Sequence, residues 1–240
     1  YILIFIIVIK YKIMLNGKIC ILLAAYNGER FIKEQIDSII GQKYENWNLF
    51  INIDCSNDNT EKIINEICEK DKRIFLLKSK EKFGSAGKNF FDLIKNAPIE
   101  DYDFIAFSDQ DDVWKPEKLL IAINILLKND YCGYSSSVTA TYVSGKQKYI
   151  KKSNSQKLVD YKFESAGPGC TYVFNVNLGL MMKKCLFNHP IIEKNFYYHD
   201  WLVYYIARNI GFNWYIDKYS YINYRQHNEN DTGANIGLKA

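Results

Sequence analysis

An uninterrupted apolar run, Ile19–Ala25, is the feature that most constrains how this chain can fold. It is short and ends at the turn residues 26–28, a pattern typical of a parallel strand buried on both faces. Apolar residues then recur at helical spacing over residues 31–41. The pattern predicts a buried strand followed by a helix, and Glu29 lies where the dipole of a helix N-terminus favours an acid.

The same alternation of strand and helix patterns continues through the first half of the chain. We expect strands at 47–53, 73–78 and 102–108, a helix capped by residues 58–61, and further helices at 88–97 and 116–128. This spacing predicts an α/β fold with a mostly parallel, Rossmann-like sheet flanked by helices, in which ligands bind beyond the carboxyl ends of the strands. Polar turns at 26–27, 54–60 and 108–112 follow three of these strands, so we expect them to meet in one crevice.

The second half departs from this rhythm and predicts a smaller mixed region. We expect a polar strand and loop at 135–152, a strand entered through glycine at 167–175, a helix at 198–209 and paired short strands at 213–224. No internal repeat or linker interrupts the chain, and 240 residues can bury one sizeable core. We therefore predict a single domain at 18–235, divided into halves at 18–130 and 131–235.

Composition excludes some classes of partner. A net charge of +4 and a pI near 8.5 are compatible with anionic substrates or an anionic membrane surface. This net charge is far smaller than that of a typical nucleic-acid-binding protein, so we expect no nucleic-acid partner. The six cysteines form no Cys-x-x-Cys pair, which favours reduced thiols and a cytoplasmic protein.

Residues 1–17 are interpreted as an N-terminal extension to this domain. The apolar run at 1–9 stops at Lys10 and is well short of the roughly 20 residues that a membrane span needs. Met14, followed by a polar turn and a strand, is a more natural start. Residues 1–13 are therefore either a truncated or wrongly assigned extension or a short membrane-associating edge.

Three acids, Asp109, Asp111 and Asp112, lie within four positions directly after a predicted strand. Their mutual repulsion would raise their pKa values unless a cation is present. Oxygen-rich, thiol-free ligation suits Mg²⁺ or Mn²⁺ bridging a diphosphate. The alternative is a solvated acidic turn that leads into the helix starting at Pro116.

Other polar residues at the expected crevice have both structural and functional interpretations. Asp54 ends a strand and could accept a hydrogen bond from a base or a ribose, whereas Asp58 and Asn59 fit a turn and helix cap. Asp200 opens an aromatic helix: it is either an acid favoured by the helix dipole or a base that takes a proton from a hydroxyl. Near the end of the chain, Arg225 suits phosphate and His227 suits a metal.

Seven blocks of sequence, in order, resemble family 2 glycosyltransferases of the GT-A fold, particularly the bacterial rhamnosyltransferase-like group. The blocks lie at residues 24–29, 54–60, 84–90, 108–114, 169–175, 199–201 and 225–227. The resemblance runs from about Lys18 to about Asn230. Each block is weak alone, but seven in the family's order make coincidence an unsatisfactory explanation.

The resemblance implies a role for each candidate site residue. By resemblance, Tyr26 and Asp54 are nucleoside contacts, Asp109 is a ribose contact, Asp111 is the metal ligand and Asp200 is the catalytic base. We also expect Ala25, Lys88 and Gln110 to bind the nucleotide sugar, and Asp109 and His227 to bind the metal. The first half of the domain would then bind the nucleotide, and the second half would hold the acceptor and the base.

The implied function is that of a metal-dependent, inverting glycosyltransferase of bacterial polysaccharide biosynthesis. Its donor would be a dTDP- or UDP-sugar carrying rhamnose or another hexose. The acceptor would be a hydroxyl of a growing cell-surface glycan, free or lipid-linked. The enzyme would then lie in the cytoplasm, with peripheral association at the inner face of the plasma membrane.

The sequence also departs from the family pattern. Ile53 and Cys55 replace an acid and a glycine after the second strand, and Ala24 stands where a hydroxyl residue is common. The substitutions at Ile53 and Cys55 leave open a catalytically impaired nucleotide-sugar-binding module. A metal-dependent nucleotidyltransferase is a third interpretation, but the first turn has no Gly-rich triphosphate loop to favour it.

Overall fold

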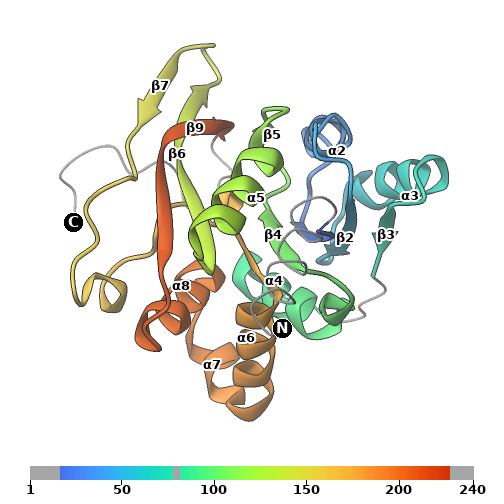
Figure 1. The fold of residues 1–240 in the computed structure, drawn as a ribbon. Helices are drawn as coiled ribbons and strands as arrows, with labels where there is room; N and C mark the ends of the chain where they lie inside the picture. The colour runs from blue at the N-terminus through green and yellow to red at the C-terminus, as the bar shows by residue number, and fades with distance from the viewer. Residues whose placement is uncertain (1–16, 78–81, 228–240) are drawn as a thin grey trace, which may run out of the picture.

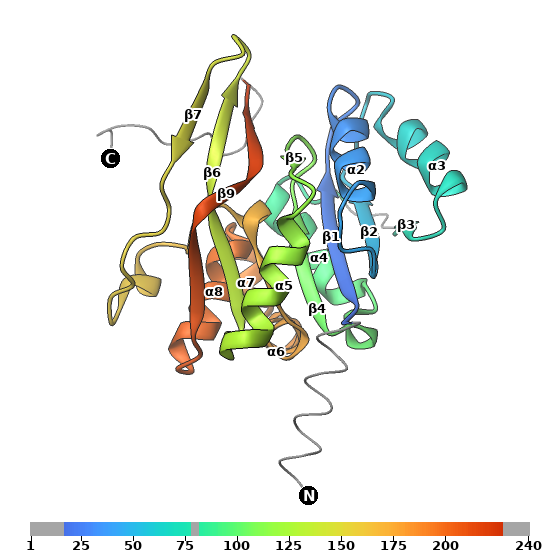
Figure 2. The same ribbon diagram turned by 45° about the horizontal axis from the view of Figure 1, so that its top comes forward.

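The computed structural model describes residues 17–77 and 82–227, which form one mixed sheet between two layers of helices (Figures 1 and 2). The strand order is β3-β2-β1-β4-β8-β6-β9-β5, and β7 pairs with the outer part of β6. This is the α/β architecture that the sequence predicts. The expectations for residues 1–13 lie outside the described residues.

The first half of the sheet is parallel and regular. Its strands are β1 (Ile19–Ala25), β2 (Trp47–Ile53), β3 (Ile74–Leu76) and β4 (Phe104–Ser108). Its helices are α2 (Ile32–Ile40), α3 (Thr60–Lys70), α4 (Ala86–Asn96) and α5 (Lys118–Asn129), with a one-turn helix η1 (Ile99–Asp101) before β4. Strands β1 and β2 match their predicted ranges residue for residue, because each is a buried apolar run closed by a turn.

Alternate side chains of β1 enter two separate cores. Ile19, Ile21 and Leu23 pack with α2, α3 and α5 on one face of the sheet. Cys20 and Leu22 pack with α4, α6 and α8 on the other face. Burial on both faces explains why the strand is apolar throughout rather than alternating.

The second half is mixed in direction. Its strands are β5 (Val113–Trp114), β6 (Gly133–Tyr142), β7 (Gln147–Ile150), β8 (Val173–Asn175) and β9 (Trp214–Gln226). Its helices are η2 (Asp160–Lys162), η3 (Gly169–Thr171), α6 (Val176–Asn188), α7 (Pro190–Asn195) and α8 (His199–Asn209). Neither α6 nor α7 was expected from the sequence. No helix within the described ranges is both long and apolar enough to cross a membrane.

The prediction of paired short strands at 213–224 is wrong, because this segment is the single strand β9. It runs parallel to β6, and its register shifts between the pairs Ser136–Asp217 and Ser137–Ser220. Lys218 and Tyr219 are the extra residues of this irregularity. Such a bulge places polar residues inside a continuous strand. In the sequence, these polar residues indicate a turn between two short strands.

Candidate active site

The loops after β1 and β2 are joined by hydrogen bonds; we call residues 26–29 and 54–60 the β1–β2 loop pair. Asn27 adopts the left-handed conformation, with φ of 44°. Its backbone N–H donates to Ser56 Oγ at 3.0 Å, and its Oδ1 accepts from the Asn57 N–H at 2.8 Å. One Glu29 carboxylate oxygen accepts from the backbone N–H of Asn59 at 2.8 Å. The loop pair is therefore a preformed edge of the crevice.

Tyr26 lies in this loop pair with about half of its surface exposed, and its contact with a base stays a prediction. Gln110, from the turn after β4, donates through Nε2 to the Tyr26 carbonyl and accepts from the Tyr26 N–H through Oε1, both at 2.8 Å. A Cβ at Gly28 would collide with that Oε1. Gln110 thus fixes the Tyr26 backbone, and the three predicted turns do meet in one place.

Asp54 is buried, and its carboxylate holds the loop that leads into α4. It accepts the N–H groups of Cys55 at 2.8 Å, Phe83 at 3.0 Å and Gly84 at 2.7 Å. A carboxylate offers about four acceptor sites, so one remains for a nucleoside. The nucleoside contact stays a prediction, and the loop-holding role was not foreseen.

The replacement of glycine by Cys55 imposes no backbone strain. Among the described residues, the non-glycine positions with positive φ are Asn27 and Asp130, and Cys55 is not one of them. Its side chain is exposed. Cysteine therefore fits the backbone of this turn, and the binding-module interpretation loses the support that Cys55 gave it.

Ala25 is the last residue of β1, and Lys88 belongs to α4. Ala25 is buried, and its carbonyl accepts the N–H of Asp54 at 2.8 Å. Lys88 lies in the first turn of α4, with Nζ 5.6 Å from the ring centre of Tyr197. Both are placed near the predicted nucleotide site, and their ligand contacts stay predictions.

Asp111 and His227 come together from opposite ends of the domain. Asp111 Oδ2 lies 2.8 Å from His227 Nε2. The Arg225 guanidinium supports the arrangement: Nε donates to the Asp111 carbonyl at 2.9 Å, and one terminal nitrogen lies 2.5 Å from a Glu34 carboxylate oxygen. Two of the predicted metal ligands are therefore in contact, although 116 residues separate them in the chain.

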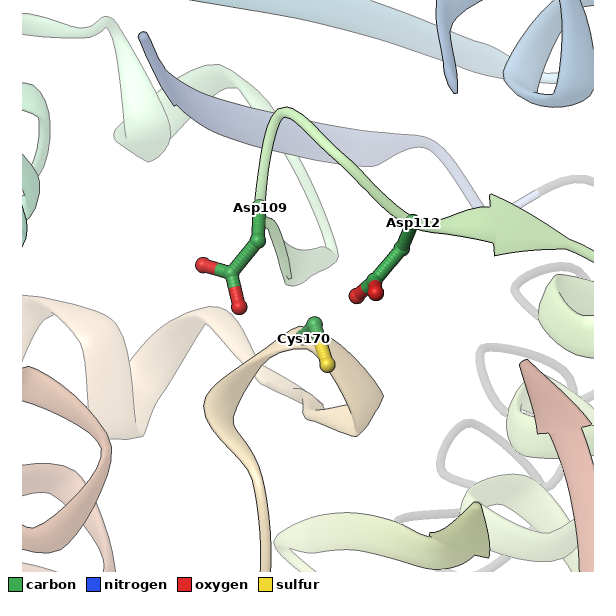
Figure 3. A group of neighbouring side chains, drawn as sticks. All are labelled: Asp109, Asp112 and Cys170. Carbon is green, nitrogen blue, oxygen red and sulfur yellow. The ribbon is translucent and has the colours of Figure 1, made fainter. Parts of the chain in front are cut away.

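The third predicted metal ligand, Asp109, lies in a different group, with Asp112 and Cys170 (Figure 3). Their ligand atoms all lie within 4.8 Å of one another. Asp112 and Cys170 are fully buried, so the alternative of a solvated acidic turn is wrong, and a thiol lies beside the acids. Cys170 comes from η3, and nothing in the local sequence could have indicated that its thiol faces the acids.

Burial dominates the electrostatics of this group. It raises the pKa of Asp112 well above the usual value, and the charges of Asp111 and Asp109 raise it further. Asp112 Oδ2 has no hydrogen-bond partner among the described residues. The Lys118 ammonium, which sequence reasoning missed, is also buried, lies 3.6 Å from the ring centre of Trp114, and has its pKa lowered by burial to about 7. Buried ionisable side chains with shifted pKa values favour a functional interpretation of the turn.

Asp200 lies on the other side of η3, in the first turn of α8. Its Oδ1 accepts the Trp201 N–H at 2.7 Å, and burial raises its pKa to about 6, against hydrogen bonds from backbone N–H groups including that of Gly169. A Cβ at Gly169 would lie 2.8 Å from His199 Nε2 and 3.0 Å from the Asp200 Cβ. Glycine is thus required for α8 to approach η3 this closely.

His199 is a buried neighbour whose role the sequence did not reveal. Its ring stacks on Phe90 with centroids 3.8 Å apart, burial lowers its pKa to about 3, and Nε2 has no partner within the described part of the chain. We call Asp109, Asp112, Cys170, His199 and Asp200 the η3 cluster, because Cys170 belongs to that turn and the other four lie close to it.

Comparison with known proteins shows which family this geometry belongs to. The sequence profile of glycosyl transferase family 2 matches residues 20–187. That segment contains the β1–β2 loop pair and the acidic turn but ends before Asp200 and His227.

Two relatives match much of the chain. The dTDP-rhamnosyl transferase RfbG of Shigella flexneri is 45% identical over 219 residues, which cover 91% of this chain and 76% of RfbG. The UDP-Glc:alpha-D-GlcNAc-diphosphoundecaprenol beta-1,3-glucosyltransferase WfgD of Escherichia coli is 30% identical over 188 residues, covering 75% of this chain and 67% of WfgD.

Solved structures share the fold. Residues 1–349 of S. aureus TarS, in complex with UDP-GlcNAc, superpose with a TM-score of 0.65 at 18% sequence identity. The match covers 89% of this chain but only 60% of the TarS chain, and it confirms the expected GT-A architecture. From the family profile, the 45% identity to RfbG and this fold, the chain belongs to glycosyl transferase family 2.

Proposed function

We propose that this chain is a metal-dependent, inverting glycosyltransferase that moves rhamnose or a related hexose from a dTDP-sugar to a hydroxyl of a cell-surface glycan. The similarity to a dTDP-rhamnosyl transferase favours dTDP over UDP in the donor. The relative named for a diphosphoundecaprenol substrate supports a lipid-linked acceptor and hence work at the inner face of the membrane.

The observation that carries the proposal is the arrangement around η3. The ligand atoms of Asp109 and Asp112 lie close to Cys170 of this turn, and Asp111, which lies between the two acids in the chain, contacts His227. Asp200 packs against Gly169, the residue before Cys170. The closeness of these acids to one short turn supports a diphosphate-binding site and a base that act together, as transfer between a donor and an acceptor requires.

The donor atoms suit a divalent cation. Carboxylate oxygens and one imidazole nitrogen are ligands that Mn²⁺ accepts readily, and carboxylates alone suit Mg²⁺. Asp111 and His227 would hold the ion, with Asp109 beside the donor. When bound, the ion would neutralise charge on the departing nucleoside diphosphate.

Asp200 would act on the acceptor. With a pKa of about 6, its carboxylate is largely ionised at neutral pH yet more basic than an ordinary aspartate. It can therefore take the proton from an acceptor hydroxyl as that oxygen attacks the anomeric carbon, an assistance worth about 10²–10⁴-fold in rate. A single displacement of this kind inverts the anomeric configuration.

Thermal unfolding with nucleotides tests the donor half of the proposal. The protein is melted with dTDP, UDP, GDP or CDP, each with Mn²⁺ and then with EDTA. Saturation at a hundred times the dissociation constant stabilises the fold by about 2.7 kcal/mol. We expect a metal-dependent shift that is largest with dTDP, and no shift with any nucleotide would contradict the proposal.

Donor turnover separates the enzyme from a binding module. We expect slow release of dTDP from dTDP-rhamnose with water as acceptor, and faster release once an acceptor is supplied. Nucleotide binding without release under any condition would favour the impaired module, for which Ile53 is the remaining support.

A further inference from the structure

Helices α6 and α7 carry apolar side chains on their outward side, where a surface helix normally carries charged ones. The exposed side chains are Leu180 (38% exposed), Met181 (40%), Phe187 (60%) and Ile191 (61%). On the opposite side of α6, Leu178, Met182 and Leu186 are buried in the core. Because α6 is apolar on both sides, its outward side has the character of a surface that is covered in use. We call these four exposed residues, with Lys184 and Lys194, the α6–α7 face.

The charge of this face is positive. Lys184 and Lys194 are exposed, and neither has a carboxylate partner among the described residues. The one acid between residues 176 and 195, Glu193, lies 2.9 Å from Lys95 and is already paired. Two lysines therefore stand beside the apolar side chains without a nearby acid to balance them.

From these observations we propose that the α6–α7 face binds the surface of an anionic lipid bilayer. Phe187, Ile191 and their neighbours would enter the boundary between headgroups and acyl chains, and Lys184 and Lys194 would contact lipid phosphates. Figure 1 shows α6 and α7 at the lower edge of the molecule, in the orange part of the ribbon. An apolar surface bordered by lysines fits an anionic bilayer better than it fits an aqueous glycan.

The orientation would bring the membrane near the base. Helix α7 leads directly into Tyr197 and Tyr198, which are 51% and 50% exposed, and then into Asp200. A bilayer on this face would lie beside the acceptor side of the crevice. This consequence for a lipid-linked acceptor rests on the proposed function, whereas the binding of lipid does not.

Vesicle flotation tests the proposal with the full chain. Vesicles of equal parts phosphatidylcholine and phosphatidylglycerol are compared with pure phosphatidylcholine, and we expect binding only to the anionic vesicles. Phe187→Ser/Ile191→Ser should lower the partition coefficient at least about tenfold, because the inserted apolar area is lost. Lys184→Gln/Lys194→Gln should lower it about tenfold as well, through loss of attraction to phosphates.

The matched control is Leu158→Ser/Phe163→Ser, which removes two side chains that are 90% and 76% exposed on another part of the surface. We expect it to bind vesicles like the wild type. Equal loss in both serine pairs, wild-type binding by Phe187→Ser/Ile191→Ser, or no binding by the wild type would each overturn the proposal.

Two further readouts separate lipid binding from self-association and from nucleotide binding. If light scattering shows a wild-type dimer that Phe187→Ser/Ile191→Ser converts to a monomer, the face is an interface between copies of the chain and the lipid proposal fails. The dTDP-dependent thermal shift should be the same in every variant, so failure of lipid binding and failure of nucleotide binding are measured separately.

Discussion

The β1–β2 loop pair and the η3 cluster both adjoin the turn after β4, but they differ in whether their polar groups are hydrogen-bonded. In the loop pair, Asn27, Glu29 and Asp54 are occupied by hydrogen bonds to the neighbouring loop. In the η3 cluster, Asp112 Oδ2 and His199 Nε2 are buried and find no partner among the described residues. The hydrogen bonds of the loop pair fix its conformation. The η3 cluster instead contains buried polar atoms that a bound ion or substrate could pair with.

The difference has an energetic meaning. A buried polar group without a partner destabilises a fold by about 1–3 kcal/mol. Such groups are uncommon unless the site has a function, because a bound ion or substrate can supply what the fold lacks. We therefore expect substitutions in the η3 cluster to affect chemistry most and substitutions in the loop pair to affect it least.

The largest effect should come from Asp200→Asn. Loss of the base should slow dTDP release from dTDP-rhamnose by about 10²–10⁴-fold, while the dTDP-dependent thermal shift is kept. In the wild type the rate should rise with pH through about 6, where this carboxyl ionises. Asp101→Asn, an exposed acid away from the crevice, is the control, and equal activity of the two variants would remove Asp200 from the mechanism.

The next largest effect should come from substitution of Asp111 or His227, whose contact joins the two halves of the domain. Asp111→Asn and His227→Ala should each weaken metal-dependent nucleotide binding, and a hundredfold loss of affinity would reduce a stabilisation of about 2.7 kcal/mol to about 0.4 kcal/mol. The measurement is the Mn²⁺-dependent part of the dTDP thermal shift. His189→Ala removes an exposed histidine and should leave it unchanged. A full Mn²⁺ response in both site variants would exclude this pair as metal ligands.

The raised pKa of Asp200 predicts a pH-dependent stability difference. Because the folded pKa is about 6 and the ordinary value is 3.8, the folded state holds the proton more tightly. Wild-type stability should therefore fall, relative to Asp200→Asn, as pH rises from about 4 to about 6 and stay lower above that. At about 1.36 kcal/mol per pH unit the gap should approach 3 kcal/mol. Urea unfolding of both proteins across this range would show it, and a gap that does not change with pH would contradict the shift.

Gly169→Ala tests the contact that joins η3 to α8. The new methyl group would press on His199 and Asp200, so we expect a loss of about 1–3 kcal/mol in the free energy of unfolding and slower donor turnover. Gly41→Ala is the control, because Gly41 has φ of −77° and the nearest atom to an added Cβ lies 3.5 Å away. Equal stability of the two variants would mean that η3 and α8 can move apart at little cost.

The two regions also differ in how far sequence could predict them. Strands β1 and β2 and the turns after them follow from local patterns: a buried apolar run, a turn signal and then a helical period. Because parallel strands place their carboxyl ends together, the meeting of these turns could be inferred before any contact was known.

The η3 cluster could not be found in this way. Cys170 reaches Asp109 and Asp112 only because β8 runs antiparallel to β4 and η3 precedes it. The contact between Asp111 and His227 was not predicted, although both were expected to bind metal, because no local pattern links residues so far apart. The bulge at Lys218 hid the continuity of β9, which brings His227 to the crevice.

The smallest effect should come from the position that first raised doubt about nucleotide binding. Cys55→Gly restores the family's residue, but Cys55 is exposed and its φ is not positive, so glycine relieves no strain. We expect the added freedom of the unfolded chain to lower stability by about 0.4–1 kcal/mol and the affinity for dTDP to stay unchanged. Thermal unfolding with and without dTDP measures both quantities. A large gain in nucleotide affinity would show that the loop pair, despite its closed hydrogen bonds, still limits what the crevice can bind.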